Sequence, residues 1–410
     1  MIAHGAQLPV AFDFRRVTSG FAGRFTSETQ AAMDYPLDSV TADGHSVHFV
    51  LGGDMTFDGE VDAGAISGTF KGGDGPGTFT LHRVPSPNLP YRVRDVTFTN
   101  GDVKLSGTLV SPRTPGLHSA VVLLHGSGPE TRWGTSRFIA DRLARAGVVV
   151  LIFDKRGSGA STGDWKTASF EDLARDALSG VALLRRQTNV DPSRIGLHGH
   201  SQGGIIAAEA ARLDRPGIAF VVAEDTVAGP VWKQDLFRTR NALSQQFKPD
   251  EVEDAMRFYS LFVEVARGKR PYADLAAAGV PVSNQPWFEW LGIPGKDSWI
   301  WPWYAKTGNV DTLDIWREVR SPALLLFGEK DSLVPVQESI AEIEAALDTN
   351  HVPFTALIVP AAEHNLTIHP QPDGPFFWWK AAPGAIDTVV AWIVVTSKQS
   401  PAMPCTCPPN

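Results

Sequence analysis

The stretch that decides the fold runs Arg194-Ile-Gly-Leu-His-Gly-His-Ser-Gln-Gly-Gly-Ile-Ile-Ala-Ala-Glu-Ala-Ala211. Its apolar run 195–197 predicts a buried strand, the G-x-S-x-G pattern follows at 199–203, and a run rich in Ala and Ile predicts a helix. A strand, this pattern and a helix, in that order, are typical of a sharp turn that raises one serine above a sheet. Such a turn strains the serine backbone and leaves no space for a Cβ two residues before or after it. Ser201 is therefore a candidate nucleophile at a helix N-terminus, where N–H groups favour negative charge.

Composition narrows the class of protein. A chain of 410 residues predicts two or three domains, and its net charge of −8 without a basic cluster argues against a nucleic-acid partner. No apolar run approaches the roughly 18 residues needed to span a membrane. The N-terminus shows no signal peptide, which favours the cytoplasm by default, or the periplasm or secretion if a signal has been removed. Both cysteines lie in the Pro-rich segment 399–410, which we expect to be a flexible tail without a metal.

Residues 1–88 predict an antiparallel β domain. Short runs of alternating apolar and polar residues are separated by glycine, as expected for strands with one buried face. Asp43-Gly44, Asp58-Gly59 and Asp74-Gly75 suggest tight turns between these strands. No Ser, His and Asp arrangement is visible here, so we expect a structural role, packing against the next domain or shaping its entrance.

Residues 89–398 predict a mostly parallel, doubly wound α/β sheet. Near-continuous apolar strands, such as 120–124 and 148–153, alternate with amphipathic helices, such as 170–186. The segment 227–316 interrupts the alternation with a helical pattern near 250–265 and a proline-containing stretch that suggests loops. Such an insertion lies over the edge where open α/β sheets bind ligands, so we predict a cap. Seven tryptophans fall in it; we expect most to form its core and a few to line an apolar pocket. Candidate substrate-binding residues are Trp299, Trp301, Trp303 and, beside the serine, His200.

A serine nucleophile needs a base, and the base needs an orienting carboxylate. Asp331 follows the predicted strand 323–328, and His364 follows the predicted strand 354–359, which gives the chain order Ser, Asp, His. We predict that Ser201, His364 and Asp331 form a catalytic triad. Competing candidates for the acid or the base are Glu224, Asp225, Glu329, Glu363, His198, His200 and His369.

An acyl-transfer intermediate also needs N–H donors for its oxyanion. One predicted donor is the amide of Gln202, directly after the candidate nucleophile. The second should come from the Gly-rich loop 125–129 after the first long buried strand. We assign it to Ser127, with Gly126 as the alternative.

These motifs together resemble the α/β-hydrolase superfamily of serine hydrolases. They comprise His125-Gly-Ser-Gly-Pro129, Asp154-Lys-Arg-Gly-Ser-Gly-Ala-Ser161, Gly199-His-Ser-Gln-Gly-Gly204, Gly328-Glu-Lys-Asp-Ser-Leu-Val-Pro335 and Glu363-His364. Within the superfamily, the chain is similar to two-domain bacterial carboxylesterases with a small N-terminal β domain. Arg156 in the second motif is expected to anchor an ion pair.

The resemblance implies hydrolysis of small carboxylic esters with short to medium acyl chains, without a cofactor. Three alternatives stay open. A peptidase or amidase of the prolyl-oligopeptidase type shares the triad but usually carries a much larger accessory domain. An acyl-CoA thioesterase would be expected to have basic residues near its pocket, and a non-catalytic binding protein would not need the triad.

Overall fold

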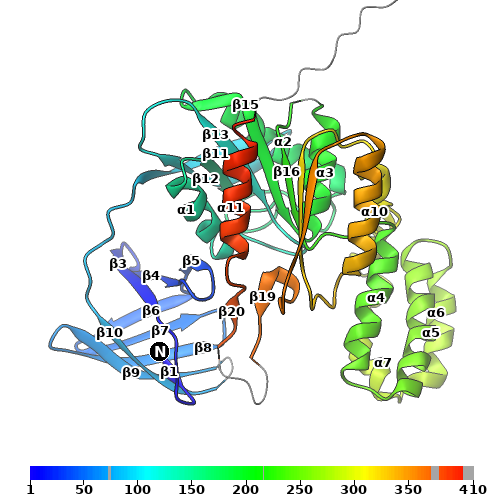
Figure 1. The fold of residues 1–410 in the computed structure, drawn as a ribbon. Coiled ribbons are helices and arrows are strands. Elements are labelled where there is room, and N and C mark those ends of the chain that lie inside the picture. The colour runs from blue at the N-terminus through cyan, green and yellow to red at the C-terminus, as the bar shows by residue number, and fades with distance from the viewer. Residues whose placement is uncertain (73–74, 216, 371–377, 400–410) are drawn as a thin grey trace, which may run out of the picture.

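The computed structural model describes residues 1–72, 75–215, 217–370 and 378–399. Two small antiparallel sheets precede a large mixed sheet covered by helices, and a group of helices projects from one end of that sheet (Figure 1). The described part therefore has the predicted fold class, an α/β-hydrolase fold after antiparallel β-sheets. Apart from residue 399, the predicted tail with Cys405 and Cys407 lies outside the described residues.

Residues 2–82 form the two antiparallel sheets, of seven and three strands. Phenylalanines from neighbouring strands fill the space between them, with Phe49 and Phe57 fully buried and stacked at 4.5 Å between ring centroids. The strands of the larger sheet are β2 (Ala6–Gln7), β1 (Ile2–Ala3), β10 (Gly77–His82), β9 (Ala65–Lys71), β8 (Met55–Asp62), β7 (Ser46–Leu51) and β6 (Ser39–Asp43), in spatial order. The smaller sheet comprises β3 (Ala11–Val17), β4 (Gly20–Ser27) and β5 (Ala32–Pro36).

Two of the predicted turns can be compared with the structure. Asp43 pairs with Ser46 across a tight turn between β6 and β7, as predicted. The turn predicted at Asp58-Gly59 is wrong, because both residues lie inside β8 and pair with β7. Gly59 is needed there for its size, since a Cβ would lie 2.9 Å from the ring of Phe79. Residue 74 of the third predicted turn lies outside the described residues.

The large sheet has eight strands and positions the candidate site. Its first two strands form a hairpin, β12 is antiparallel to β14, and from β14 onward all neighbours are parallel. In spatial order the strands are β11 (Tyr91–Asn100), β12 (Val103–Pro112), β14 (Val149–Phe153), β13 (His118–Leu124), β15 (Val190–His200), β16 (Val221–Glu224), β17 (Ala323–Gly328) and β18 (Phe354–Val359).

Helices cover both faces of this sheet, which explains its near-continuous apolar strands. Two apolar cores lie on its opposite faces, one beneath α2, α3 and α10, the other beneath α1 and α11. These helices are α1 (Thr135–Arg145), α2 (Phe170–Arg185), α3 (Gln202–Leu213), α10 (Val336–Thr349) and α11 (Ala385–Thr396). Near the site, a short helix η2 (His364–Leu366) precedes the small hairpin of β19 (Thr367–Ile368) and β20 (Lys380–Ala381).

The helices between β16 and β17 are here called the insertion; those from α4 to α8 have an apolar core of their own, and the last, α9, belongs to the core of the large sheet. The helical prediction near 250–265 is confirmed by α5. The stretch interpreted as loops is largely helical, because Pro281 and Pro286 lie at helix starts, where a missing N–H costs nothing. The insertion comprises α4 (Val231–Ser244), α5 (Pro249–Ala266), α6 (Tyr272–Gly279), η1 (Val280–Val282), α7 (Pro286–Leu291), α8 (Ile300–Thr307) and α9 (Thr312–Trp316).

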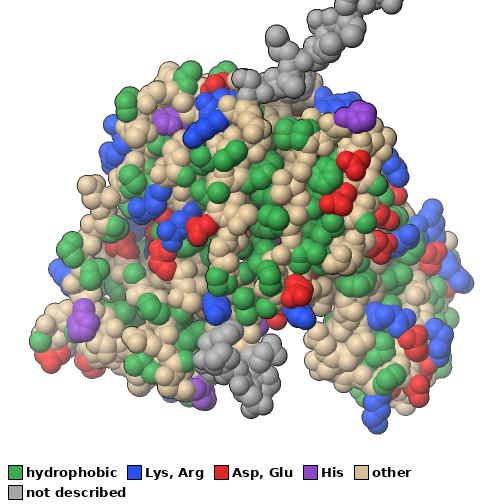
Figure 2. Space-filling view, viewed as in Figure 1, with side chains coloured by type: hydrophobic (Ala, Val, Ile, Leu, Met, Phe, Trp, Pro, Cys, Tyr) green, Lys and Arg blue, Asp and Glu red, His purple; other side chains and the backbone are tan. Residues whose placement is uncertain are grey.

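On the face shown in Figure 2, acidic and basic side chains are interspersed over the insertion. Among the described residues, no helix is both long enough and apolar enough to cross a membrane.

Candidate active site

Ser201 lies on the sharp turn between β15 and α3. Its backbone has φ 54° and ψ −120°, a strained conformation for a residue with a side chain. A Cβ on Gly199 would lie 1.9 Å from the carbonyl oxygen of Gly203, and one on Gly203 would lie 2.5 Å from that of Leu124. The two glycines are therefore required by close backbone contacts, and they allow the turn that raises Ser201 above the sheet.

Asp331 and His364 meet beyond the ends of β17 and β18. The Nδ1 atom of His364 lies 2.8 Å from Oδ2 of Asp331. The other carboxylate oxygen accepts hydrogen bonds from the amides of Leu333 and Val334, at 2.7 and 3.0 Å. The Asp331 side chain is thus fixed from both sides and holds the imidazole ring in one orientation.

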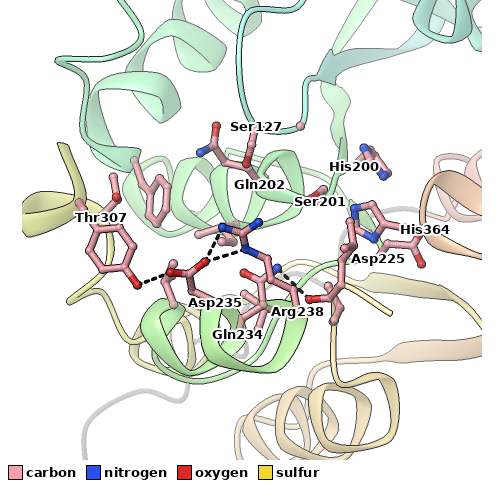
Figure 3. A pocket seen from close by; sticks show the side chains of 18 of the residues that line it. Ser127, His200, Ser201, Gln202, Asp225, Gln234, Asp235, Arg238, Thr307 and His364 are labelled. Carbon is pink, nitrogen blue, oxygen red and sulfur yellow. Dashed lines mark hydrogen bonds and ion pairs between the residues drawn. The ribbon is translucent and has the colours of Figure 1, made fainter. Parts of the chain in front are cut away.

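Ser201 and His364 line one cavity of about 410 Å³ at the carboxyl end of the parallel strands, together with Gly126, Ser127 and Gln202 (Figure 3). No hydrogen bond joins the Ser201 hydroxyl to His364 among the described side chains. Catalytic hydrogen bonds are often long in substrate-free enzymes and shorten only when substrate binds. The structure therefore brings together every residue predicted for the triad and for oxyanion binding, with Asp331 held behind His364.

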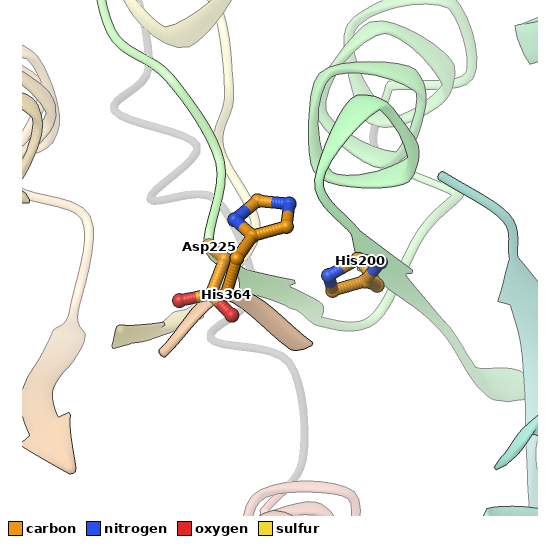
Figure 4. Close-up of side chains that lie close together, drawn as sticks. All are labelled: His200, Asp225 and His364. Atoms are coloured by element: carbon orange, nitrogen blue, oxygen red, sulfur yellow. The ribbon is translucent and has the colours of Figure 1, made fainter. Parts of the chain in front are cut away.

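Asp225 is a second carboxylate beside His364. It follows β16, is fully buried, and accepts a hydrogen bond of 2.8 Å from the amide of Gly328. Potential donor atoms of Asp225, His200 and His364 lie within 4.8 Å of one another (Figure 4). In the described part of the chain, this is the one group of three His, Cys, Asp or Glu side chains close enough together to hold a metal ion. One ring nitrogen of His364, Nδ1, is however already hydrogen-bonded to Asp331.

The remaining candidates for the catalytic acid and base have other partners. Among the described residues, Asp331 is the only one of the candidate acids whose carboxylate hydrogen-bonds to His364. Glu224 lies 3.0 Å from His198, and Glu329 accepts a hydrogen bond from the Ala361 amide. The ring of His369 stacks on Trp379. Glu363 precedes His364, and its backbone amide bonds to the Thr367 carbonyl.

The two histidines that line the cavity, His364 and His200, have pKa values shifted in opposite directions. Burial alone would lower the pKa of His364, but its hydrogen bond to Asp331 and the charges of Asp331 and Asp225 together raise it. Burial and the neighbouring His364 lower the pKa of His200 to about 4, so His200 is neutral near pH 7. Burial raises the pKa of Asp225 to about 7. His364 is therefore the histidine suited to take up a proton.

Lys155 is a residue of the site that the sequence analysis missed. Its buried ammonium donates one hydrogen bond to the Gly126 carbonyl and another to the Gln202 side chain, both at 2.7 Å. Burial lowers its pKa to about 8, partly offset by the charge of Glu130. Lys155 thus connects the loop 125–129 to the start of α3. Its position directly after a buried strand was the available signal.

The neighbouring Arg156 does what the sequence predicts. It forms two hydrogen bonds with the buried Asp176, of 2.6 and 2.7 Å, and so anchors its loop to α2.

The predicted aromatic wall is only partly present. Trp303 lines the cavity, but Trp299 and Trp301 are not among its lining residues. Trp299 is 41% exposed and packs against Trp165, and the Trp301 indole donates a hydrogen bond to the Gly295 carbonyl. His200 does line the cavity. Residues contributed by the insertion that sequence reasoning missed are Val231, Gln234, Asp235, Arg238, Tyr259, Phe262, Ile300, Tyr304 and Thr307.

A second cavity, of about 360 Å³, lies on the other side of His200. It shares Gly126, Glu130, His200 and Asn365 with the first cavity. Residues 30 and 31 of the N-terminal β region contribute to its wall. The N-terminal sheets therefore reach the neighbourhood of the candidate site.

The arrangement of the large sheet and its helices defines the structural class, the α/β-hydrolase fold. A family model described as "Alpha/beta hydrolase family" matches residues 121–399, and the chain belongs to this family. The resemblance inferred from the motifs is therefore confirmed.

Several known proteins are similar to parts of this chain. Esterase EstD of Thermotoga maritima is 31% identical over 36% of this chain and 36% of its own. Thiohydrolase aneE of Aspergillus aculeatus is 26% identical over 61% of this chain and 81% of its own. The crystal structure of the α/β hydrolase GrgF from Penicillium sp. sh18 covers 76% of this chain and all of its own, with 19% identity and a TM-score of 0.48. The chain spans about half the length of other curated relatives that it matches.

Proposed function

We propose that this protein is a serine hydrolase that cleaves carboxylic esters through a Ser201-His364-Asp331 triad and an acyl-enzyme intermediate. The observation that carries the proposal is the 2.8 Å hydrogen bond between His364 and Asp331, in the same site as the strained Ser201. A strained serine, a histidine with a raised pKa and a buried carboxylate behind it are the three parts of an activated nucleophile.

In the proposed mechanism, His364 removes the hydroxyl proton as the Ser201 oxygen attacks the ester carbonyl. Asp331 keeps the imidazole in the required tautomer and stabilises the imidazolium that forms. The amides of Gln202 and Ser127 donate hydrogen bonds to the oxyanion. The proton passes from His364 to the leaving alcohol, and a water molecule activated by His364 then releases the acid. The insertion acts as a cap over this site and shapes the substrate cavity.

The ester preference has support from composition of the cavity and from a relative. Part of the wall consists of aliphatic and aromatic side chains, such as Phe170, Ile205 and Phe262, and this part suits acyl chains of short to medium length. A relative of 31% identity carries the name esterase. A thioester of the same acyl group is the second candidate, because the relative aneE is named a thiohydrolase.

A substrate panel tests the proposal. It contains p-nitrophenyl esters of increasing chain length, an S-acyl thioester with a matched acyl group, and an aminoacyl p-nitroanilide. We expect hydrolysis of the esters, with a maximum at short to medium chains. Cleavage of the anilide alone would overturn the proposal in favour of a peptidase, and a strong preference for the thioester would favour the second candidate.

A further inference from the structure

Arg238 is the one Lys or Arg among the described residues that line the candidate active-site cavity. It lies on α4 of the insertion. Figure 3 shows its guanidinium pointing from α4 into the cavity, toward the side that holds Ser201 and Gln202. About half of the Arg238 side chain is exposed, so a ligand in the cavity can reach it.

A buried carboxylate holds the guanidinium in place. Arg238 Nε donates a hydrogen bond of 2.7 Å to Asp235 Oδ1, and Nη2 lies 2.5 Å from the same oxygen. The hydroxyls of Tyr259 and Tyr304 donate to the other oxygen of Asp235, at 3.0 and 2.8 Å. Asp235 is itself only 5% exposed. The carboxylate is therefore fixed by groups from three helices, and it sets the direction of the arginine.

This arrangement leaves one edge of the guanidinium free. Arginine has five N–H donors, and Asp235 engages those on the Nε side. Nη1 has no hydrogen-bond partner among the described residues. Together with the second proton of Nη2, it presents the pair of parallel donors that binds a carboxylate through both oxygens.

Resting on the proposed function, we propose that Arg238 binds a carboxylate of the substrate, and that the substrates are esters carrying a second, free carboxylate. Asp235, Tyr259 and Tyr304 are positioning residues for Arg238. The apolar part of the cavity wall, which includes Phe170, Ile205 and Phe262, accommodates the carbon chain between the ester and the carboxylate.

The first test compares pairs of esters in which one member carries a free carboxylate and the other does not. Monoethyl succinate, glutarate and adipate are paired with ethyl butyrate, pentanoate and hexanoate, and 4-carboxyphenyl acetate with phenyl acetate; acid release is measured at constant pH. We expect at least one carboxylate ester to have a kcat/KM roughly 10- to 100-fold above its neutral partner, as charge-assisted hydrogen bonds provide. A preference for the neutral ester in every pair would overturn the proposal.

Substitution locates the effect. Arg238→Gln should raise KM for the preferred carboxylate ester roughly 10- to 100-fold more than it raises KM for the neutral partner. Arg240→Gln is the matched control, because Arg240 lies on the same helix with similar exposure but pairs with Glu253 outside the cavity. Equal losses on both members of a pair, or equal effects of the two variants, would contradict the proposal.

A binding measurement separates this proposal from the proposed reaction. Monoethyl glutarate and ethyl pentanoate are titrated calorimetrically into Ser201→Ala protein, with and without Arg238→Gln. We expect monoethyl glutarate to bind at least tenfold more tightly than ethyl pentanoate, and Arg238→Gln to remove the difference. Equal affinities would overturn carboxylate binding by Arg238. If monoethyl glutarate binds as expected but the parent protein cleaves no ester, the proposed hydrolysis fails while the assignment of Arg238 stands.

Discussion

The carboxyl edge of the large sheet and the insertion above it differ in how closely their backbone segments pack. At the sheet edge, backbone meets backbone so closely that a Cβ on Gly199 would lie 1.9 Å from a carbonyl oxygen. In the insertion, by contrast, a Cβ on Gly295 would have no atom within 4 Å. Helices α4 to α8 of the insertion share an apolar core of their own, and α9 packs into the core of the large sheet against α3 and α10. Side-chain hydrogen bonds, such as that from Asn241 to the Ser332 carbonyl, also connect the insertion to the sheet edge.

This difference suggests a division of labour. The tightly packed edge fixes the positions of Ser201, His364 and Asp331, which set the proposed reaction. The insertion supplies one wall of the cavity, including Trp303 and Arg238, and so would set which substrate is accepted. Substitutions at the edge should therefore change kcat or the fold, and substitutions in the insertion should change KM and substrate preference.

The largest expected effect is at the nucleophile. Ser201→Ala should lower kcat for p-nitrophenyl butyrate by roughly three to six orders of magnitude, because no other group can form the acyl-enzyme. Trp303→Ala, in the insertion, should change KM and chain-length preference and leave kcat within about tenfold. Steady-state kinetics of both purified variants measure the difference. Retained activity in Ser201→Ala would show that Ser201 is not the nucleophile, and the proposed division of roles between the sheet edge and the insertion would then fail.

The two carboxylates beside His364 should differ sharply. Asp331→Asn is expected to lower kcat by about four orders of magnitude, because it removes the charge that orients and stabilises the imidazolium. Asp225→Asn should cost far less, since Asp225 bonds to the Gly328 amide and not to Nδ1 of His364. The same kinetic assay ranks them. The reverse order would move the catalytic acid from the end of β17 to the end of β16.

Stability tests the difference in packing directly. Gly199→Ala should lower the free energy of unfolding by roughly 3 kcal/mol, because its Cβ would collide with backbone that cannot move aside. Gly295→Ala should stay within about 0.5 kcal/mol of the parent, as expected for an open surface position. Urea denaturation followed by tryptophan fluorescence measures both. Similar values for the two variants would argue against the tight edge.

Lys155 should matter for positioning. Lys155→Met removes the connection between Gly126 and Gln202 and should lower kcat roughly 10- to 100-fold with little change in KM, because the oxyanion donors lose their alignment. Lys306→Met is the control, since Lys306 in the insertion donates a hydrogen bond to the exposed Thr167 carbonyl and, in the described part of the chain, to no other group. A loss confined to KM, or an equal loss in the control, would contradict this role.

The smallest effect is a shift in pH dependence. A base must be neutral to take up a proton, so kcat/KM should rise with pH through the pKa of His364, which lies above its usual value. Burial lowers that pKa, and Asp331 and Asp225 raise it. Asp225→Asn removes one of the charges that favour the imidazolium, so the rise should move to lower pH. A pH profile of kcat/KM for both proteins measures the shift, and a move to higher pH would contradict the electrostatic explanation.

The contrast between the two regions also explains what sequence could predict. The buried strands and the G-x-S-x-G turn follow from local patterns, and parallel strands bring their carboxyl ends to one edge. The meeting of Ser201, Asp331 and His364 in one site was therefore predictable, although their roles remain a proposal. The placement of Asp225 beside His364, in addition to Asp331, could not be predicted. Both carboxylates follow strands, and only the geometry of their loops decides how close each lies to the histidine.

The insertion was less predictable because four of its helices, α6 to α9, have only five to eight residues and are held by contacts with segments distant in sequence. Trp299 and Trp303 are only four residues apart, yet Trp303 lines the cavity and Trp299 faces outward, and nothing in their spacing assigns these directions. The Asp235-Tyr259-Tyr304 cluster joins the consecutive helices α4 and α5 to α8, which is more distant in sequence. Lys155 was missed because its partners become apparent only once the loop 125–129 and α3 are placed together.

The central claim is that Ser201 is the activated nucleophile. The most direct measurement is treatment of the full chain with a fluorophosphonate, followed by intact-mass analysis and peptide mapping. We predict one adduct per chain, on Ser201, formed at least a hundredfold more slowly when Asp331 is replaced by Asn. No adduct, or an adduct on another residue with Ser201 unmodified, would contradict the account.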